Sequence, residues 1–406
     1  MIYFEMRLHE LISPIYINHT IFSRSHISCQ SIIIIMETHN RHDHHEITNH
    51  TDDEENYFFA MQMAGSVALP WTIKAAVDLE VFDILSKAGP EEYLSASAIA
   101  SHFSTKNPDA AQALDRILCL LVSHSLLTCK PVTLESGHVE RRYGLAERSK
   151  YLAKAEDGVS LSWFMLLGQH QEFFSAWSHL KDAVLEGGDV PVFDKVNGYS
   201  VFDYYYYRRN PNVGKTFNSS LHSMTSIIME KMVEIYKGFE GLKSLVDIGG
   251  GTGTAISYIK RKYPSIKAIN FDLPSVVEHA PQIPGVEHLG GDMFASIPKA
   301  EAVFMKSVIH NWSDEHCLKL LKNCYEALPD HGKVIIMDLV SPQVPKPNSS
   351  MRNFYQSDVF MMALMQGGKE RDEENLNVLA KEAGFALVKV VCYAYGHWVV
   401  ELHKSA

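Results

Sequence analysis

A glycine-rich turn is the first place where residue types in this sequence point to chemistry. Ser244–Gly253 (SLVDIGGGTG) is typical of a buried strand that runs into a glycine turn and then a helix. Gly249, Gly250, Gly251 and Gly253 let the backbone turn sharply and approach a ligand closely, and the helix that follows points its free amide groups at that ligand. The turn predicts a nucleotide-type cofactor site, with an ordinary strand-to-helix turn as the alternative.

Polar residues also end the later apolar runs, where a core would not need them. They are Asp272, Asp292, Lys306 and Asp338. Asp272 lies 23 residues beyond Gly249, which is the spacing at which an acid on the second strand meets ribose hydroxyls. A matching acid makes the cofactor interpretation of the glycine turn the stronger one.

These residues need a scaffold, and the second half of the chain alternates strand and helix patterns, which predicts an α/β fold with a parallel sheet. Ligands of such open sheets bind beyond the carboxyl ends of the strands, where the polar residues stand. The seven strands that we expect cover residues 244–248, 267–271, 286–289, 302–305, 333–338, 386–393 and 398–402.

The preceding part, residues 57–200, is mainly helical and contains a winged-helix outline: two short helices and a hairpin around Ser136. Such a unit can bind DNA, and Lys130, Arg141 and Arg142 would be the basic residues of its wing. An acidic chain with so few positive charges in this unit is a poor DNA-binding candidate, so we expect the unit to be a packing or dimerisation domain.

Composition narrows the classes of function. The 406 residues carry a formal net charge of −11, which argues against a nucleic-acid partner, and no apolar run approaches the roughly 18 residues that span a bilayer. The six cysteines form no CxxC pair and fit reduced thiols in a cytoplasmic protein.

The first residues differ from the rest. A polar tract follows Met36, which we expect to be the natural start, and its lack of apolar residues predicts disorder up to about Asn56. The expected organisation is a disordered extension over 1–56, a dimerisation domain over 57–200 and a cofactor-binding domain over 201–406.

From about Tyr57 to the C-terminus, the chain resembles the plant phenolic O-methyltransferases of the caffeic-acid type, which use S-adenosylmethionine. The resemblance implies a Rossmann-like methyltransferase domain, a homodimer built through the helical N-terminal half, and no metal. The motifs that carry it are LVDIGGGTG, INFDLP (269–274), GVEHLGGDMF (285–294), FMKSVIHNWSDEHC (304–317) and GGKERDEENLNVLAKEAGF (367–385).

The resemblance also implies which residues hold the cofactor. Carboxylates accept hydrogen bonds from ribose or adenine groups, and a methionine offers a polarizable apolar surface to a ring. The implied residues are Gly249 at the methionine end, Asp272 with its neighbour Leu273 at the ribose, Asp292 and Met293 at the adenine, and Lys306, which completes the site.

A phenol has a pKa of about 10, so it needs a base to take its proton as it attacks the methyl group. The resemblance places that base at His310, with Asp338 and Glu370 as flanking carboxylates. Position 338 more often carries glutamate in the family. Aspartate is one methylene shorter, so we expect a slight shift of the histidine with activity retained.

The acceptor pocket departs from the family pattern. Where caffeic-acid enzymes have asparagines, this chain has Gly168 and Met365, so the pocket is roomier and more apolar. We expect a flavonoid, coumarin, stilbene, alkaloid phenol or other large phenylpropanoid as acceptor. The implied pocket residues are Leu167, Gly168, Phe217, Leu221, Met224, Phe360, Met361 and Met365.

Three alternatives remain open. Relatives that methylate the amine of anthranilate also depart at position 338, so N-methylation is the second candidate. A winged-helix regulator that only senses the cofactor is disfavoured by His310 with Glu370, and a dinucleotide oxidoreductase is disfavoured by Thr254 where Gly or Ala is needed.

Overall fold

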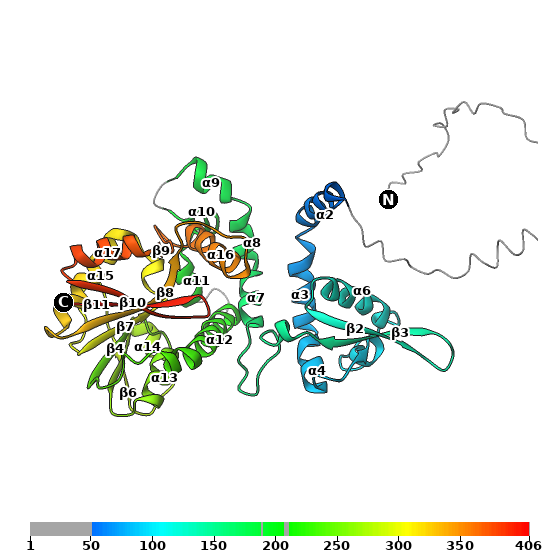
Figure 1. Cartoon of the computed structure of the whole chain (residues 1–406), viewed down its shortest axis with the longest axis horizontal. Helices are drawn as coiled ribbons and strands as arrows, with labels where there is room; N and C mark the ends of the chain where they lie inside the picture. The colour runs from blue at the N-terminus through cyan, green and yellow to red at the C-terminus, as the bar shows by residue number, and fades with distance from the viewer. Residues whose placement is uncertain (1–50, 188–189, 207–210, 406) are drawn as a thin grey trace, which may run out of the picture. The chain divides into compact units, whose positions relative to one another are not determined.

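The computed structural model (Figure 1) describes residues 51–187, 190–206 and 211–405. The chain divides into two compact units, Met1–Gly65 and Ser66–Ala406. The expected start at Met36 and most of the expected N-terminal disorder lie outside the described residues.

The described part of the first unit is helix α2 (Asp52–Ala64). Thr51 and Glu54 form a capping box: the Glu54 amide donates to Thr51 Oγ1 at 3.2 Å, and the Thr51 amide donates to Glu54 Oε2 at 2.9 Å. Four acidic residues in the first turn also stabilise the helix through their interaction with the positive end of the helix dipole. The prediction of disorder up to Asn56 is therefore wrong for residues 52–56.

The second unit begins with the expected winged-helix outline. Ser95 caps α5 (Ala96–Ala100), the first of the two predicted helices, and the hairpin forms as predicted. Leu85, Ile99, Leu118 and Tyr143 are fully buried in its core. The elements are α3 (Ala68–Asp78), α4 (Val81–Ala88), α5 (Ala96–Ala100), α6 (Ala110–Ser123) and a small sheet of order β1-β3-β2 from β1 (Leu94–Ser95), β2 (Leu127–Thr133) and β3 (Val139–Leu145).

A middle group of helices connects this part to the main sheet. Several aromatic side chains pack in its core, where the rings of Phe173 and Phe360 stack with centroids 5.8 Å apart. The elements are η1 (Glu147–Ser149), α7 (Ser162–Gly168), α8 (Gln171–Trp177), α9 (Leu180–Leu185), α10 (Val192–Asn197), α11 (Val201–Tyr206) and α12 (Pro211–Ile235).

The main sheet has the order β10-β11-β8-β7-β4-β5-β6, and a short β9 (Arg371–Asp372) pairs with β8. All seven predicted strands are confirmed, and β9 was missed because it has only two residues. The strands are β4 (Ser244–Ile248), β5 (Lys267–Asp272), β6 (Val286–Gly290), β7 (Ala302–Lys306), β8 (Lys333–Ser341), β10 (Leu387–Ala394) and β11 (His397–His403).

Helices cover both faces of this sheet (Figure 1). One buried cluster joins the sheet to α15 and α17, and another joins it to α12 and α13. Strand β4 pairs with both β5 and β7, so the strand order reverses there, and such a switch point leaves a crevice at the carboxyl ends. The remaining elements are α13 (Thr254–Lys262), α14 (Pro274–Val277), η2 (Ile309–Asn311), α15 (Asp314–Ala327), α16 (Ser349–Leu364) and α17 (Glu373–Glu382).

None of the helices in the described residues combines the length and the apolar character needed to cross a membrane. The predicted boundary between residues 200 and 201 stays a prediction.

Leu320 of α15 is completely buried against the sheet, whereas Leu185 of α9 is 77% exposed. Leu320→Ala should lower the free energy of unfolding by about 2–5 kcal/mol, because it leaves a cavity in the core. Leu185→Ala is the matched control and should change it by less than about 0.5 kcal/mol. Denaturant unfolding measures both, and equal effects would contradict the burial assigned to α15.

Candidate active site

A cavity of about 1720 Å³ lies at the carboxyl ends of the parallel strands. The turns after β4, β5, β6 and β7 form one wall, and side chains of α7, α12 and α16 form another. All six residues predicted to bind the cofactor line this cavity: Gly249, Asp272, Leu273, Asp292, Met293 and Lys306.

The glycine turn has the backbone that its sequence predicts. Gly249, Gly251 and Gly253 have φ angles of +62°, +57° and +86°, a region that other residues avoid. Gly250 is needed for space, because a Cβ atom there would lie 2.0 Å from Oδ1 of Asn270. Gly253 precedes the first residue of α13, so the free amides at the start of that helix lie beside the turn.

Asp272 ties the glycine turn to the end of β5. Its Oδ2 accepts from the Gly251 amide at 2.8 Å, and its Oδ1 accepts from the Leu273 amide at 2.7 Å. Burial raises the pKa of Asp272, and these two backbone hydrogen bonds oppose that shift. Each carboxylate oxygen keeps a second lone pair with which it can accept a bond from a ligand hydroxyl.

Lys306 brings a buried cation to the same wall. Burial lowers its pKa to about 8, although the charges of Asp338 and Asp247 act in the opposite direction. Asp292 and Met293 lie at the turn after β6, where Asp292 Oδ1 accepts from the Phe294 amide at 2.8 Å. A carboxylate, a thioether and a cation therefore converge on one cavity wall.

His310 lies in η2, just after β7, and also lines the cavity. Its Nδ1 is 2.9 Å from Glu370 Oε1 and 3.8 Å from Asp338 Oδ1, and its side chain is only 14% exposed. Because both carboxylates approach Nδ1, Nε2 is the ring nitrogen that is left to exchange a proton with a ligand.

Glu370 is held in place on both sides. Its Oε1 also accepts from Ser357 Oγ at 2.8 Å, and its amide donates to Asp358 Oδ1 at 2.9 Å. The turn that carries His310 is held by the next residue, Arg371, whose guanidinium donates to the carbonyls of Ile309 and Trp312. Neither Ser357 nor Arg371 was predicted, although Arg371 stands in the motif GGKER.

Asp338 lies beside His310, as predicted for a flanking carboxylate, but at 3.8 Å it makes no hydrogen bond to the ring. The carboxylate is 3% exposed and has no hydrogen-bond partner within the described ranges, so it acts on His310 through charge alone. Burial lowers the pKa of His310, but Asp338 and Glu370 outweigh that effect and raise it. Burial in turn raises the pKa of Asp338.

The ligand atoms of His310, Asp338 and Glu370 lie within 4.8 Å of one another, close enough to hold a metal ion. The hydrogen bond between His310 and Glu370 already accounts for part of this closeness. The predicted absence of a metal stays a prediction.

The structure brings together most of the predicted acceptor residues. Gly168 ends α7 and does not line the cavity. A Cβ atom at Gly168 would meet nothing within 4 Å, so the position has room for a side chain. The seven that line the cavity are Leu167, Phe217, Leu221, Met224, Phe360, Met361 and Met365.

Several ionisable residues of the cavity were not predicted, among them Asp247 and His397. Asp247 lines it at the end of β4, and the rule that singled out Asp272 would also have found it. His397 begins β11, and burial, assisted by the Lys306 cation, lowers its pKa to about 3. No sequence signal distinguishes His397 from an ordinary strand residue.

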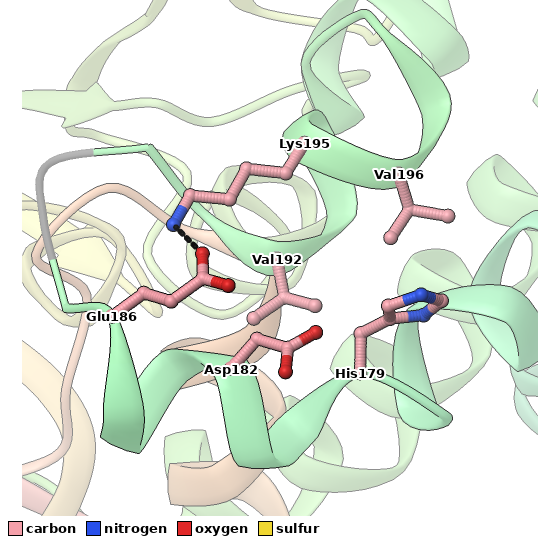
Figure 2. Close-up of a pocket in the computed structure, with 6 residues that line it drawn as sticks. All are labelled: His179, Asp182, Glu186, Val192, Lys195 and Val196. Carbon is pink, nitrogen blue, oxygen red and sulfur yellow. Dashed lines mark hydrogen bonds and ion pairs between the residues drawn. The ribbon is translucent and has the colours of Figure 1, made fainter.

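A second, smaller cavity of about 290 Å³ lies between α9 and α10 (Figure 2). It is lined by His179, Asp182, Glu186, Val192, Lys195 and Val196, and Lys195 pairs with Glu186 at 3.4 Å. None of the predicted site residues lies there.

Comparison with known proteins finds two family models. An O-methyltransferase dimerisation domain matches residues 61–155, and an O-methyltransferase domain matches residues 177–386. Caffeic acid 3-O-methyltransferase 1 of Populus tremuloides is 51% identical over 87% of this chain and 96% of its own length. Caffeic acid 3-O-methyltransferase of Rosa chinensis is 50% identical over the same shares.

Solved structures share the fold. Human N-acetylserotonin methyltransferase, in complex with S-adenosylmethionine, has a TM-score of 0.73 and 21% identity, over 88% of this chain and all of its own. A methyltransferase of calicheamicin biosynthesis, solved with S-adenosylhomocysteine, has a TM-score of 0.72 and 22% identity over the same shares.

Asp338→Asn should lower the pKa of His310, because it removes a carboxylate whose charge stabilises the imidazolium. An NMR titration of the histidine ring measures the shift. Asp330→Asn, at an exposed turn after α15, is the matched control and should leave the titration unchanged. An unchanged pKa in Asp338→Asn would mean that Glu370 alone determines it.

Proposed function

The chain belongs to the O-methyltransferase family, and we propose that it transfers a methyl group from S-adenosylmethionine to a phenolic hydroxyl of a phenylpropanoid-type compound, with His310 as general base. The observation that carries the role of His310 is its position on the cavity wall, with Glu370 at Nδ1. The relatives named caffeic acid 3-O-methyltransferase support the phenolic acceptor.

The cavity fits the cofactor. We propose that the glycine turn lies beside its methionine end, that Asp272 with Leu273 binds the ribose, and that Asp292 with Met293 binds the adenine. Lys306 lies on the same wall. S-adenosylmethionine supplies an electrophilic methyl group on a sulfonium centre.

The chain's own contribution to the reaction is deprotonation and orientation. His310 takes the phenol proton on Nε2 while Glu370 keeps the ring oriented through Nδ1. The imidazolium that results is stabilised by the charges of Glu370 and Asp338. Because only neutral His310 accepts a proton, the rate should rise with pH through the pKa of His310, which lies above its ordinary value.

The seven predicted acceptor residues that line the cavity are all apolar, which supports a large, flat acceptor. Phe217, Phe360 and Met365 line it, and Met365 stands where caffeic-acid enzymes have asparagine. Met365 offers no amide group to hydrogen-bond a small acid, so the wall should bind an extended aromatic acceptor more tightly than a small acid.

The enzyme forms a homodimer through the segment that the dimerisation-domain model matches. Within that segment Met61, Met63 and Val67 are 54%, 48% and 59% exposed, so a partner subunit can cover apolar surface there.

We also propose a cytoplasmic location, which the five described cysteines, all free thiols, support.

His310→Ala should lower kcat by about 10²- to 10⁴-fold, because it removes the general base. Binding of S-adenosylhomocysteine, measured by calorimetry, should be retained. His316→Ala is the matched control, since His316 packs against Trp312 with ring centroids 5.7 Å apart but does not line the cavity. Equal losses in the two variants would mean that His310 only supports the packing of Trp312.

A panel assay by kcat/KM should rank flavonoid, coumarin or stilbene phenols above caffeic acid. Met365→Asn should shift the preference toward caffeic acid by about 1–3 kcal/mol, because it restores one polar contact. Mass spectrometry of the product identifies the methylated atom. Caffeic acid as the best substrate would contradict the argument from Met365, and preferential methylation of an anthranilate-type amine would replace the phenolic acceptor.

A further inference from the structure

Two buried oxygen atoms lie beneath the glycine turn. Asp247 of β4 and Asn270 of β5 are register partners and are 1% and 0% exposed. A Cβ atom on Gly250 would lie 2.0 Å from Asn270 Oδ1 and 2.9 Å from Asp247 Oδ2, so the two oxygens lie on the same side of Gly250 and no more than about 5 Å apart. Neither oxygen has a hydrogen-bond donor among the residues that the structure describes.

The hydrogen bonds of Asn270 determine which way its amide points. Nδ2 donates to the Gly251 carbonyl at 2.9 Å and to His288 Nδ1 at 3.1 Å. His288 Nε2 in turn lies 2.9 Å from the Pro281 carbonyl, to which it donates. Both amide hydrogens of Asn270 are therefore used, and Oδ1 must be the atom beside Asp247.

An ionised Asp247 would place one acceptor against another in a dry environment, which is unfavourable. A proton on the carboxyl group removes the conflict. We propose that Asp247 is held as a neutral carboxylic acid whose O–H donates to Asn270 Oδ1, and that it is thereby a positioning residue for the glycine turn.

The charges around Asp247 are consistent with this state. Burial raises the pKa of Asp247 to about 8, and the nearby Asp272 carboxylate adds to the shift. A backbone hydrogen bond from Ile256 and the Lys306 cation act in the opposite direction. Two histidines lie on the neighbouring elements. His288 of β6 binds Asn270 and the Pro281 carbonyl, and His222 of α12 contacts Thr254 Oγ1 at 3.1 Å.

The proton completes a network that holds Gly251 from both sides. Asn270 binds its carbonyl and Asp272 binds its amide, so the two residues fix the peptide planes that face the cavity. Ionisation of Asp247 as pH rises through about 8 should push Asn270 Oδ1 away and loosen this grip. Affinity for a ligand beside the turn should then fall.

The inference rests on the proposed position of the cofactor beside the turn, and binding of S-adenosylhomocysteine tests it by calorimetry. At neutral pH, Asp247→Asn should bind within about threefold of the wild type, because its amide NH₂ replaces the O–H as donor to Asn270. Asp247→Ala removes the donor and should bind about tenfold more weakly. Exposed Asp330→Asn is the matched control.

The pH dependence gives a second measurement. Wild-type affinity should fall more steeply above pH 8 than the affinity of Asp247→Asn, which has no proton to lose at this position. Any slope that remains in Asp247→Asn belongs to Lys306, whose pKa of about 8 lies in the same range. Identical slopes, or a large loss of neutral-pH affinity in Asp247→Asn, would overturn the proposal, the latter because Asp247 would then act as a carboxylate.

Infrared spectroscopy of the ligand-free protein keeps this inference separate from the proposed function. At neutral pH the wild type should show a carbonyl band of a protonated carboxylic acid that Asp247→Asn lacks, in addition to any band from Asp338, whose pKa burial also raises. The absence of that band from the wild type would overturn the proposal. If the wild type shows the band but does not bind S-adenosylhomocysteine, the proposed function fails and the protonation of Asp247 stands.

Discussion

The burial of charge at the carboxyl edge of the parallel sheet is the constraint on which the whole site depends. Asp247 lies near the end of β4, Lys306 ends β7, and Asp338 lies within β8. Burial shifts the pKa of each residue toward the neutral form of its side chain. Lys306 partly compensates both acids, since its charge lowers their pKa values while theirs raise its own. Because an unpaired buried charge costs several kcal/mol, the ionisation state of each of the three depends on that of the others.

The base depends on a different interaction, between two segments about 60 residues apart. Lys369 donates its amide to the His310 carbonyl, Glu370 binds the ring, and Arg371 binds the carbonyls on either side. The glycine before them has no room for a side chain, because a Cβ atom on Gly368 would lie 3.0 Å from the His310 carbonyl oxygen. A tertiary contact, rather than local helix geometry, therefore determines where the histidine points.

Strand positions and strand-end residues could be predicted because they follow from local patterns. The apolar run before Gly249 and the acid at Asp272 can be recognised in the sequence. The parallel register of β4 and β5 then brings the ends of these two strands together. The distance from Asp338 to His310 could not be predicted, since it depends on how β8 packs against the turn η2 that carries His310. The helix that begins at Asp52 runs against the polar composition of this segment, because the capping residues Thr51 and Glu54 stabilise its first turn.

The two walls of the cavity differ in how far sequence spacing can describe them. The residues on the cofactor side lie at the ends of paired strands. A shift of one residue in a strand would turn all its side chains to the other face of the sheet, so the sequence spacing of these residues should be retained between relatives. Acceptor-side residues sit on α7, α12 and α16, whose mutual positions come from side-chain packing. Gly168 illustrates the consequence, since one step along the end of α7 separates it from Leu167, which lines the cavity. Acceptor preference can thus change by substitution on the helices while the strand-end residues stay in place.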